Sequence, residues 1–240
     1  MTLLMPEMPD RHALPLYLQI SEMLIRDINA GRLADGVRLP PERAFAQELG
    51  ISVGTLRKAL EVLVQKGLLE RVQGSGNYIR AKVDVQAVYA FFRVELLEGG
   101  GLPTAQVLDV TRMRKPDDFP AFGRGPEAHR IRRLRFLNKV PAILEEIWLD
   151  AEYAPRITRA DLSESLYLYY RDKLGLTVRR VEDRMSVAEV PAWAPLAYGV
   201  APGGLTLCAT RISFDQEGRR AEVSRGWIDT SVAAYVARLT

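Results

Sequence analysis

The hydrophobic positions in the first third of the chain recur every three or four residues, the spacing of short amphipathic helices. Pro15 can open a first helix and Gly31 can end it. A second helix is predicted from Pro41 to Leu49, and a third from Ser52, a natural N-cap, to about Lys66. The apolar faces of the three helices are Leu16, Ile20, Met23, Leu24 and Ile28; Ala44, Phe45 and Leu49; and Leu56, Leu60, Leu63 and Val64.

After Gly67, residues 68–72 and 77–80 predict two strands joined by a glycine turn at 73–76. The order helix, helix, turn, helix, hairpin is that of a winged helix–turn–helix, in which the second helix of the motif reads the major groove. A small helical domain for protein contacts is the alternative. We therefore predict a flexible arm at 1–12, a DNA-binding domain at 13–80 and a linker at 81–88.

From residue 89 onwards strand-like segments separated by turn residues replace the helical spacing. Asn138-Lys139 is a predicted hairpin turn, and Asp161 and Glu164 are a predicted capping pair for a helix over 161–174. A second short helix is predicted over 191–199. This pattern predicts an α+β fold on an antiparallel sheet over residues 89–240, with strands at 105–113, 129–137, 142–149, 178–188, 205–214 and 220–228.

The amino-acid composition excludes more kinds of functional site than the net charge does. The 240 residues include one cysteine and two histidines, so we expect no disulfide framework, no metal site and no cofactor. The net charge is only +3, but residues 38–80 hold seven basic and four acidic side chains, a local basic face. With no long apolar stretch and no signal-peptide pattern, we expect a cytoplasmic protein without a membrane partner.

Arginines cluster in the predicted strand over 129–137. Alternation places Arg133 and Arg135 on one face, where two guanidinium groups could clamp a carboxylate or phosphate. Glu145 lies on the next predicted strand. A plain cross-strand Arg–Glu pair, worth at most about 1 kcal/mol, is the alternative reading.

The segment LPPERAFAQELGISVGTLRKALEVLVQKGLLERVQGSGNYI resembles the winged helix–turn–helix of GntR-family bacterial transcription regulators. The resemblance covers roughly residues 14–80 and rests on Leu39–Arg43, Ile51–Arg57 and Gln73–Asn77. Val53 and Gly54 stand where the family usually has Arg and Thr, so a usual operator sequence is not expected. The resemblance implies contacts to double-stranded DNA from Arg43, Ser52, Thr55, Arg57, Lys58, Gln73, Gly74, Ser75 and Gly76.

Three later segments resemble the UTRA effector domain, a chorismate lyase-like fold found in one branch of that family. They are HRIRRLRFLNKVPAILEEIWL, DLSESLYLYY and residues 215–224. Tyr89-Ala90-Phe91-Phe92 lacks the Ser/Thr-Phe pair of sugar-phosphate sensors, which favours another small polar ligand, anionic or zwitterionic. The resemblance implies ligand contacts from Arg133, Arg135, Glu145, Ser165, Tyr167, Glu222 and Trp227.

Together these observations predict a metabolite-responsive transcription regulator, acting as a homodimer and a repressor that a small effector releases from a palindromic operator. One alternative is a regulator whose C-terminal domain serves mainly dimerisation. The other is a lyase-type enzyme on the same fold, but the sequence shows no nucleophile–base pair, and we expect no catalytic residues.

Overall fold

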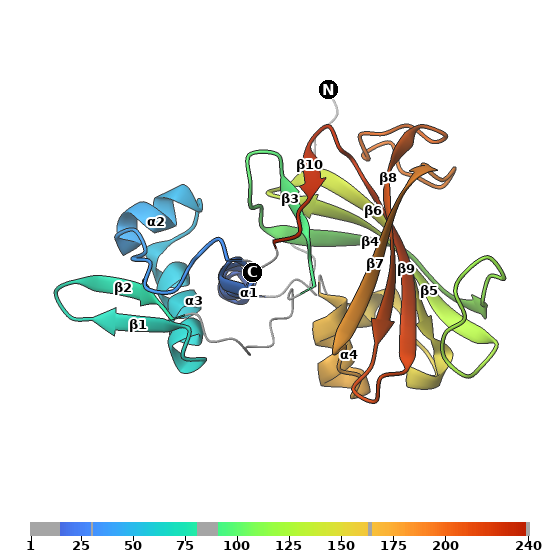
Figure 1. Ribbon diagram of the computed structural model, residues 1–240, viewed down its shortest axis with the longest axis horizontal. Helices are drawn as coiled ribbons and strands as arrows, with labels where there is room; N and C mark the ends of the chain where they lie inside the picture. The colour runs from blue at the N-terminus through green and yellow to red at the C-terminus, as the bar shows by residue number, and fades with distance from the viewer. Residues whose placement is uncertain (1–14, 30, 81–90, 163–164, 239–240) are drawn as a thin grey trace, which may run out of the picture.

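The computed structural model describes residues 15–29, 31–80, 91–162 and 165–238. The predicted arm at 1–12, the linker at 81–88 and the capping residue Glu164 therefore lie outside the described residues. Figure 1 shows a helical N-terminal unit beside a larger C-terminal unit built on a sheet. None of the described helices is long and apolar enough to cross a membrane.

The N-terminal unit packs its helices around one apolar core. Its elements are α1 (Leu16–Asn29), α2 (Glu42–Glu48), α3 (Val53–Gln65), β1 (Leu69–Val72) and β2 (Gly76–Ile79). The predicted apolar faces of α1 and α3 meet in this core, where Ile20, Leu24, Leu56, Leu60 and Leu63 are almost fully buried. The short α2 buries Phe45 and Ala46 in the same core. This packing stabilises a helix that is too short to be stable alone.

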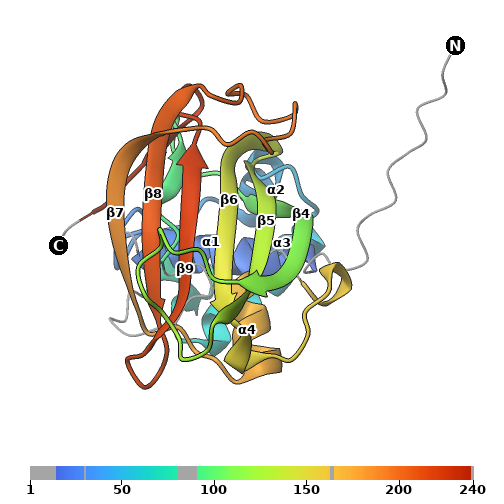
Figure 2. The same cartoon turned by 90° about the vertical axis from the view of Figure 1, so that its right-hand side faces the viewer.

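A six-stranded antiparallel sheet forms the C-terminal unit. Figure 2 shows its strands side by side in the order β4-β5-β6-β9-β8-β7. These strands are β4 (Pro103–Arg114), β5 (Glu127–Leu137), β6 (Val140–Asp150), β7 (Arg180–Glu189), β8 (Leu205–Phe214) and β9 (Arg220–Ile228). Neighbouring strands are consecutive along the chain except for β6 and β9 at the centre. Asn138 and Lys139 join β5 to β6 with positive φ angles of 48° and 69°. This geometry is that of the tight turn predicted for these two residues.

The two faces of the sheet bury different side chains. One face packs Ile131, Ile147 and Leu149 against α4 (Leu166–Leu174), where Tyr170 is fully buried. On the other face Leu134, Leu144 and Trp227 pack against the segment between β7 and β8. Since neighbouring residues of a strand point to opposite faces, arginines 133 and 135 lie on the α4 side of the sheet.

Two predicted helices differ from the structure. The helix expected over 161–174 begins at Leu166 with Ser165 as its N-cap, while Asp161 ends a separate 3₁₀ turn, η2 (Arg159–Asp161), and caps it together with Thr158. Residues 191–199 form turns instead of a helix. Pro191 and Pro195 each accept a turn hydrogen bond, and a proline inside a helix removes a backbone donor.

The structure also contains elements that the sequence did not reveal. β3 (Val94–Leu96) pairs with β10 (Ala233–Tyr235) in a two-stranded ribbon, and a 3₁₀ turn, η1 (Ala151–Tyr153), follows β6. Figure 1 shows the ribbon at the side of the sheet that faces α1. Three-residue strands carry too little alternation to be recognised.

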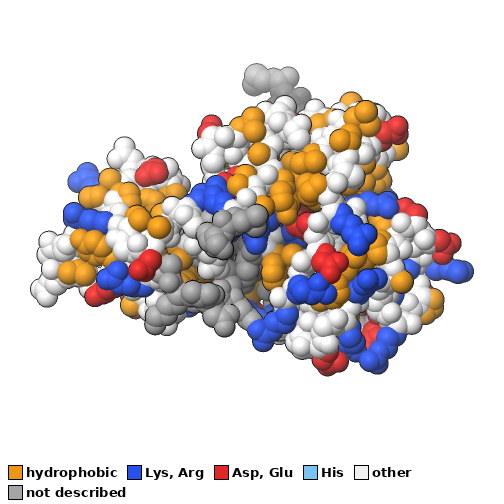
Figure 3. Space-filling view, viewed as in Figure 1, with side chains coloured by type: hydrophobic (Ala, Val, Ile, Leu, Met, Phe, Trp, Pro, Cys, Tyr) orange, Lys and Arg blue, Asp and Glu red, His pale blue; other side chains and the backbone are white. Residues whose placement is uncertain are grey.

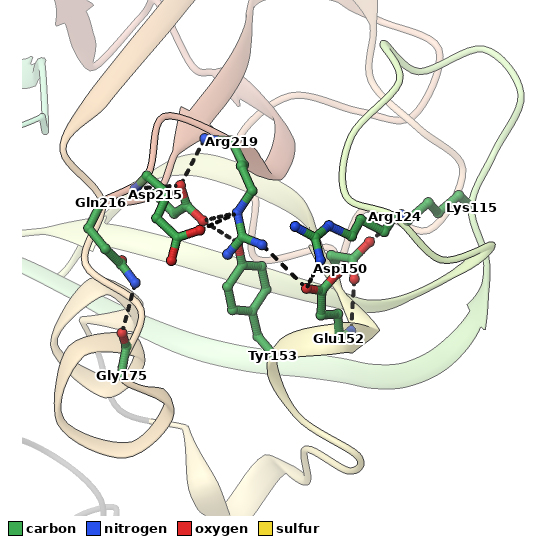
Figure 4. Close-up of polar contacts among 10 residues, drawn as sticks. Lys115, Arg124, Asp150, Glu152, Tyr153, Gly175, Asp215, Gln216 and Arg219 are labelled. Atoms are coloured by element: carbon green, nitrogen blue, oxygen red, sulfur yellow. Dashed lines mark hydrogen bonds and ion pairs between the residues drawn. The ribbon is translucent and has the colours of Figure 1, made fainter.

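Two buried aspartates fasten the loops at the end of the sheet beside α4, as Figure 4 shows. Asp150 accepts from the Lys115 ammonium and from the Glu152 backbone amide. Asp215 accepts from the Tyr153 hydroxyl at 2.8 Å and from the Arg219 guanidinium at 2.9 Å. Asp215, the first residue of the segment 215–224, therefore has a structural role, closing the β8–β9 turn.

Candidate functional site

The N-terminus of α3 presents the residues predicted to contact DNA. Ser52 caps the helix by accepting a hydrogen bond from the Thr55 amide at 3.1 Å, and its hydroxyl lies 2.9 Å from the Thr55 hydroxyl. Ser52, Arg57 and Lys58 are exposed, and Thr55 is half-buried. The buried stripe of the same helix holds it against α1 and α2, so its opposite side is left for a partner.

Arg57 is exposed but not free. Its Nε lies 2.6 Å from Glu42 Oε2, and 66% of its side chain remains accessible. Arg43 and Lys58 are exposed and join no ion pair within the described residues. Figure 3 shows Lys and Arg side chains over the end of the molecule formed by α2 and the β1–β2 hairpin. Arg57 would have to leave Glu42 to reach a base, whereas Arg43 and Lys58 are available to phosphate.

The β1–β2 hairpin has the form of a wing. Val72 faces Gly76 at its tip, and Gln73 and Gly74 are exposed, while Ser75 hydrogen-bonds to the Tyr78 hydroxyl. Gly74 and Gly76 have φ angles of 74° and 134°, which side chains rarely adopt. Arg38 forms a β-bridge with Tyr78, and its Nε lies 3.1 Å from the position that a Cβ atom at Gly76 would take. Arg38 is a basic wing residue that the sequence reading did not single out.

A cavity of about 110 Å³ opens on the α4 side of the sheet. One water molecule needs roughly 10–15 Å³ of cavity volume measured with a water-sized sphere. The cavity therefore has room for several waters or a small metabolite. Strands β5, β6, β8 and β9, the start of α4 and the β3–β10 ribbon all contribute to its wall. Four arginines and two glutamates line it: Arg93, Arg133, Arg135, Arg211, Glu145 and Glu222.

One end of the cavity is a buried cluster of two arginines on one glutamate. Arg133 Nη2 lies 2.7 Å from Glu145 Oε2, and Arg135 Nε lies 3.0 Å from Glu145 Oε1. The side chains of Arg133 and Arg135 are only 3% and 5% exposed. Burial raises the pKa of Glu145, but the two guanidinium groups outweigh it and hold that pKa below its ordinary value. The cross-strand pair considered as an alternative is therefore present, within the cavity itself.

Arg135 can still donate a hydrogen bond after it pairs with Glu145. Its Nη1 is buried and has no hydrogen-bond partner among the described residues. A buried donor without a partner carries a desolvation cost, which an anionic ligand would remove.

Hydroxyl groups surround the other glutamate. Glu222 accepts from the Tyr170 hydroxyl at 2.7 Å and from the Ser213 hydroxyl at 2.9 Å, and the Tyr167 hydroxyl lies 3.4 Å away. Burial raises the pKa of Glu222 above its ordinary value despite these hydrogen bonds. Ser165 caps α4 at the same wall and is 2% exposed, so the positive end of the helix dipole also meets the cavity.

The structure brings six of the seven predicted effector residues together. Arg133, Arg135, Glu145, Ser165, Tyr167 and Glu222 all line the cavity. Trp227 does not, because alternation along β9 points it to the opposite face, where it packs against Trp193. Its neighbour Gly226 lines the cavity instead, opposite Glu145.

Arg211 is the main cavity residue that sequence reasoning missed. It pairs with Asp183 at 2.6 Å and donates to the Phe91 carbonyl at 2.6 Å. Burial lowers the pKa of Arg211, but Asp183 and Tyr167 outweigh it and raise that pKa above its ordinary value. An isolated arginine in an alternating strand gives no sequence signal, and only the neighbouring strands place it in the cavity. Arg225 borders the cavity only along β9, because alternation points its side chain to the opposite face, where it pairs with Asp118 at 2.9 Å and lies over the Phe119 ring.

Comparison with known proteins agrees with this architecture. Residues 16–79 match the family model described as "Bacterial regulatory proteins, gntR family", and residues 98–232 match the UTRA domain. The HTH-type transcriptional regulator SmoD of Agrobacterium fabrum is 58% identical over 227 residues, covering 95% of this chain and 97% of that protein. The HTH-type transcriptional repressor NagR of Bacillus subtilis is 26% identical over 214 residues, covering 87% and 88%. The chain therefore belongs to the GntR family and is a transcriptional regulator with a UTRA domain.

Solved structures show the same fold. YydK from Bacillus subtilis matches with a TM-score of 0.51 and 20% identity, covering 95% of this chain and all of that one. A ligand-binding domain from Bordetella bronchiseptica matches with a TM-score of 0.54 and 24% identity, covering 62% of this chain and 98% of that one. The fold class predicted from sequence, a winged helix–turn–helix followed by an antiparallel-sheet α+β domain, is confirmed. The relatives that match over most of the chain are transcription regulators, so the lyase alternative is set aside.

Proposed function

We propose that this regulator is a homodimeric repressor that a small anionic, hydroxyl-bearing metabolite releases from a palindromic operator. The observation that carries the ligand class is the charge of the cavity, which four arginines and two glutamates line. The unpartnered Nη1 of Arg135 supports an anionic group at that end. Glu145, Glu222 and the hydroxyls near Glu222 supply acceptors and donors for the polar remainder of the ligand.

Operator binding is assigned to α3 and the wing. In this proposal Arg57 forks onto a guanine in the major groove, while Arg43 and Lys58 contact phosphates. Val53 and Gly54 stand beside Ser52 at the N-terminus of α3, and neither supplies a polar group to a base edge. We therefore expect an operator that differs from sites read by an arginine at that place.

Fluorescence anisotropy with a labelled fragment of the DNA upstream of its own gene tests operator binding. We expect tight binding that weakens with salt, and much weaker binding to a scrambled fragment of equal length. Equal affinity for both fragments would contradict the proposal. Light scattering of the free protein should give twice the monomer mass of 26.9 kDa, since half-sites about 34–36 Å apart require two recognition helices.

A thermal-shift screen tests the cavity. The screen compares neutral sugars with sugar acids, hydroxycarboxylic acids, amino acids and phosphorylated metabolites. A ligand at 100 times its Kd stabilises the folded state by about 2.7 kcal/mol, which the melting temperature will show. The hit should come from the anionic classes, should lose its effect in Arg135→Gln and should lower the affinity for the upstream DNA. A neutral sugar as the strongest hit would overturn the assigned ligand class.

A further inference from the structure

The first helix of the DNA-binding unit is fastened to the β3–β10 ribbon of the effector unit. Arg32, which follows α1, lies 2.6 Å from Glu95 on β3. Arg238, which follows β10, binds the same carboxylate at 2.7 and 3.1 Å. Glu95 is buried, and Arg26 of α1 donates to the Gly101 carbonyl at 3.1 Å. The two units therefore meet through specific polar contacts: Arg32, just after α1, contacts the ribbon at Glu95, and Arg26 of α1 contacts Gly101 between β3 and β4.

The opposite side of the same ribbon forms part of the cavity wall. Val94 and Tyr235 line the cavity, and Val94 packs with Ile143 and Ile228, which line it too. Because side chains alternate along a strand, Val94 points to the effector unit while Glu95 points to α1. A strand of three residues thus has the cavity on one side and the DNA-binding unit on the other.

The ring of Phe92 contacts both an arginine of the cavity and an arginine of α1. Phe92 lines the cavity and lies two residues before the start of β3. The guanidinium carbon of Arg135 lies 5.0 Å from the centre of its ring, and that of Arg26 lies 5.6 Å from it. Both distances are within the range of cation–π attraction. An arginine of the cavity and an arginine of α1 therefore share a single ring.

We propose that Phe92 and the β3–β10 ribbon are the element through which an occupied cavity changes the docking of α1, and hence the placement of the DNA-binding unit. This assignment of regulation rests on the proposed function of the cavity. An anion that binds Arg135 Nη1 changes the position of the guanidinium that stacks on Phe92, and the ring carries that change to Arg26. By linkage, the docking of α1 and the affinity for the ligand alter each other by the same factor.

Hydrogen–deuterium exchange of the full-length chain tests this coupling without knowledge of the ligand. Arg135→Gln removes the cavity cation from the ring, and we expect the amides of α1 to exchange at least about fivefold faster, the lower end of ordinary couplings between sites. Glu222→Gln is the matched control, since it also changes a buried charge of the cavity but faces Tyr170 and Ser213. It should leave the exchange of α1 unchanged.

A double-mutant cycle separates the ring from a general loss of stability. In a Phe92→Leu background, Arg135→Gln should add nothing further to the exchange of α1. Equal effects of Arg135→Gln with and without Phe92, or equal effects of Arg135→Gln and Glu222→Gln, would overturn the proposal. If Arg135→Gln fails to fold, Arg26→Gln asks the same question from α1, and the expected result is faster exchange in β3 and around residue 135. Unchanged exchange there would also overturn it.

These outcomes are independent of the proposed function. DNA binding and ligand binding are measured in separate experiments, so a protein that binds no anion could still show the coupling. Conversely, an anion-responsive repressor in which α1 ignores Arg135 would retain the proposed function and lose this route of regulation.

Discussion

Arg57 in the DNA-binding unit and Arg133 in the effector unit each pair with a glutamate, at 2.6 and 2.7 Å. Their surroundings differ completely, since 66% of the Arg57 side chain is exposed against 3% of that of Arg133. Water screens the first pair, so this pair contributes little to stability and Arg57 can leave Glu42 at little cost. The second pair is desolvated, and removing one partner leaves an uncompensated charge in the protein interior. The same chemistry therefore serves an exchangeable surface in one unit and a fixed cavity wall in the other.

The largest expected effect comes from removing the shared glutamate of the cavity. Glu145→Ala leaves Arg133 and Arg135 buried without their carboxylate and should lower the free energy of unfolding by about 3–5 kcal/mol. Urea denaturation followed by circular dichroism measures this loss. The matched control is Glu42→Ala, which breaks the exposed pair with Arg57 and should cost no more than about 1 kcal/mol. Similar losses from both variants would remove the distinction between the two pairs.

A smaller effect is expected at the DNA-reading surface, in specificity instead of stability. Arg57→Ala should reduce the discrimination between the upstream DNA and single-base variants by about 1–3 kcal/mol at one position. Lys58→Ala should weaken binding to all sequences alike and reduce the slope of log K against log salt by about 0.9. Anisotropy titrations at several salt concentrations measure both. If the two variants lose affinity in the same way, Arg57 does not read a base.

The cap of α3 ranks next. Ser52→Ala removes the acceptor for the Thr55 amide and should lower stability by about 1 kcal/mol. Thermal unfolding measures the change, and Ser52→Asn, which retains a capping oxygen, should restore most of it. If Ser52→Ala leaves stability unchanged but weakens DNA binding, the main role of Ser52 is to contact DNA and not to cap α3.

The smallest effect concerns pH, and the two cavity glutamates should give opposite slopes. The pKa of Glu145 is lowered in the folded protein, so its contribution to stability is present above the unfolded pKa of about 4.3 and is lost as the pH falls through the folded pKa. The pKa of Glu222 is raised by burial, so its contribution is present below that unfolded value and is lost as the pH rises through the folded pKa.

Unfolding of the two Gln variants between pH 3 and 8 measures these slopes. Relative to the unmodified protein, Glu145→Gln should become less stable as the pH rises, and Glu222→Gln should become more stable. Parallel slopes would show that the two carboxyl groups experience the same environment, which their different partners argue against.

Local patterns predicted most of the fold. The bounds of β8 and β9 agree with the predicted strands, and the Ser52 cap and the Asn138-Lys139 turn have the expected geometry. The two wrong helix predictions have physical causes. Prolines prevent a helix over residues 191–199, and Ser165, not Asp161, caps the N-terminus of α4. The β3–β10 ribbon escaped notice because its pairing joins residues far apart in the sequence.

For the N-terminal unit, the sequence by itself determined the helices, the cap of α3 and the glycine turn of the wing, because helix spacing, a capping serine and glycine turns act between neighbouring residues. For the cavity, alternation along β5 and β6 determined that Arg133, Arg135 and Glu145 share a face. Tertiary structure alone decided that Arg211 joins them, that Trp227 faces away, and that Phe92 lies between Arg135 and α1. The reason is that burial and charge balance depend on which strands become neighbours, and that pairing is a property of the whole folded chain.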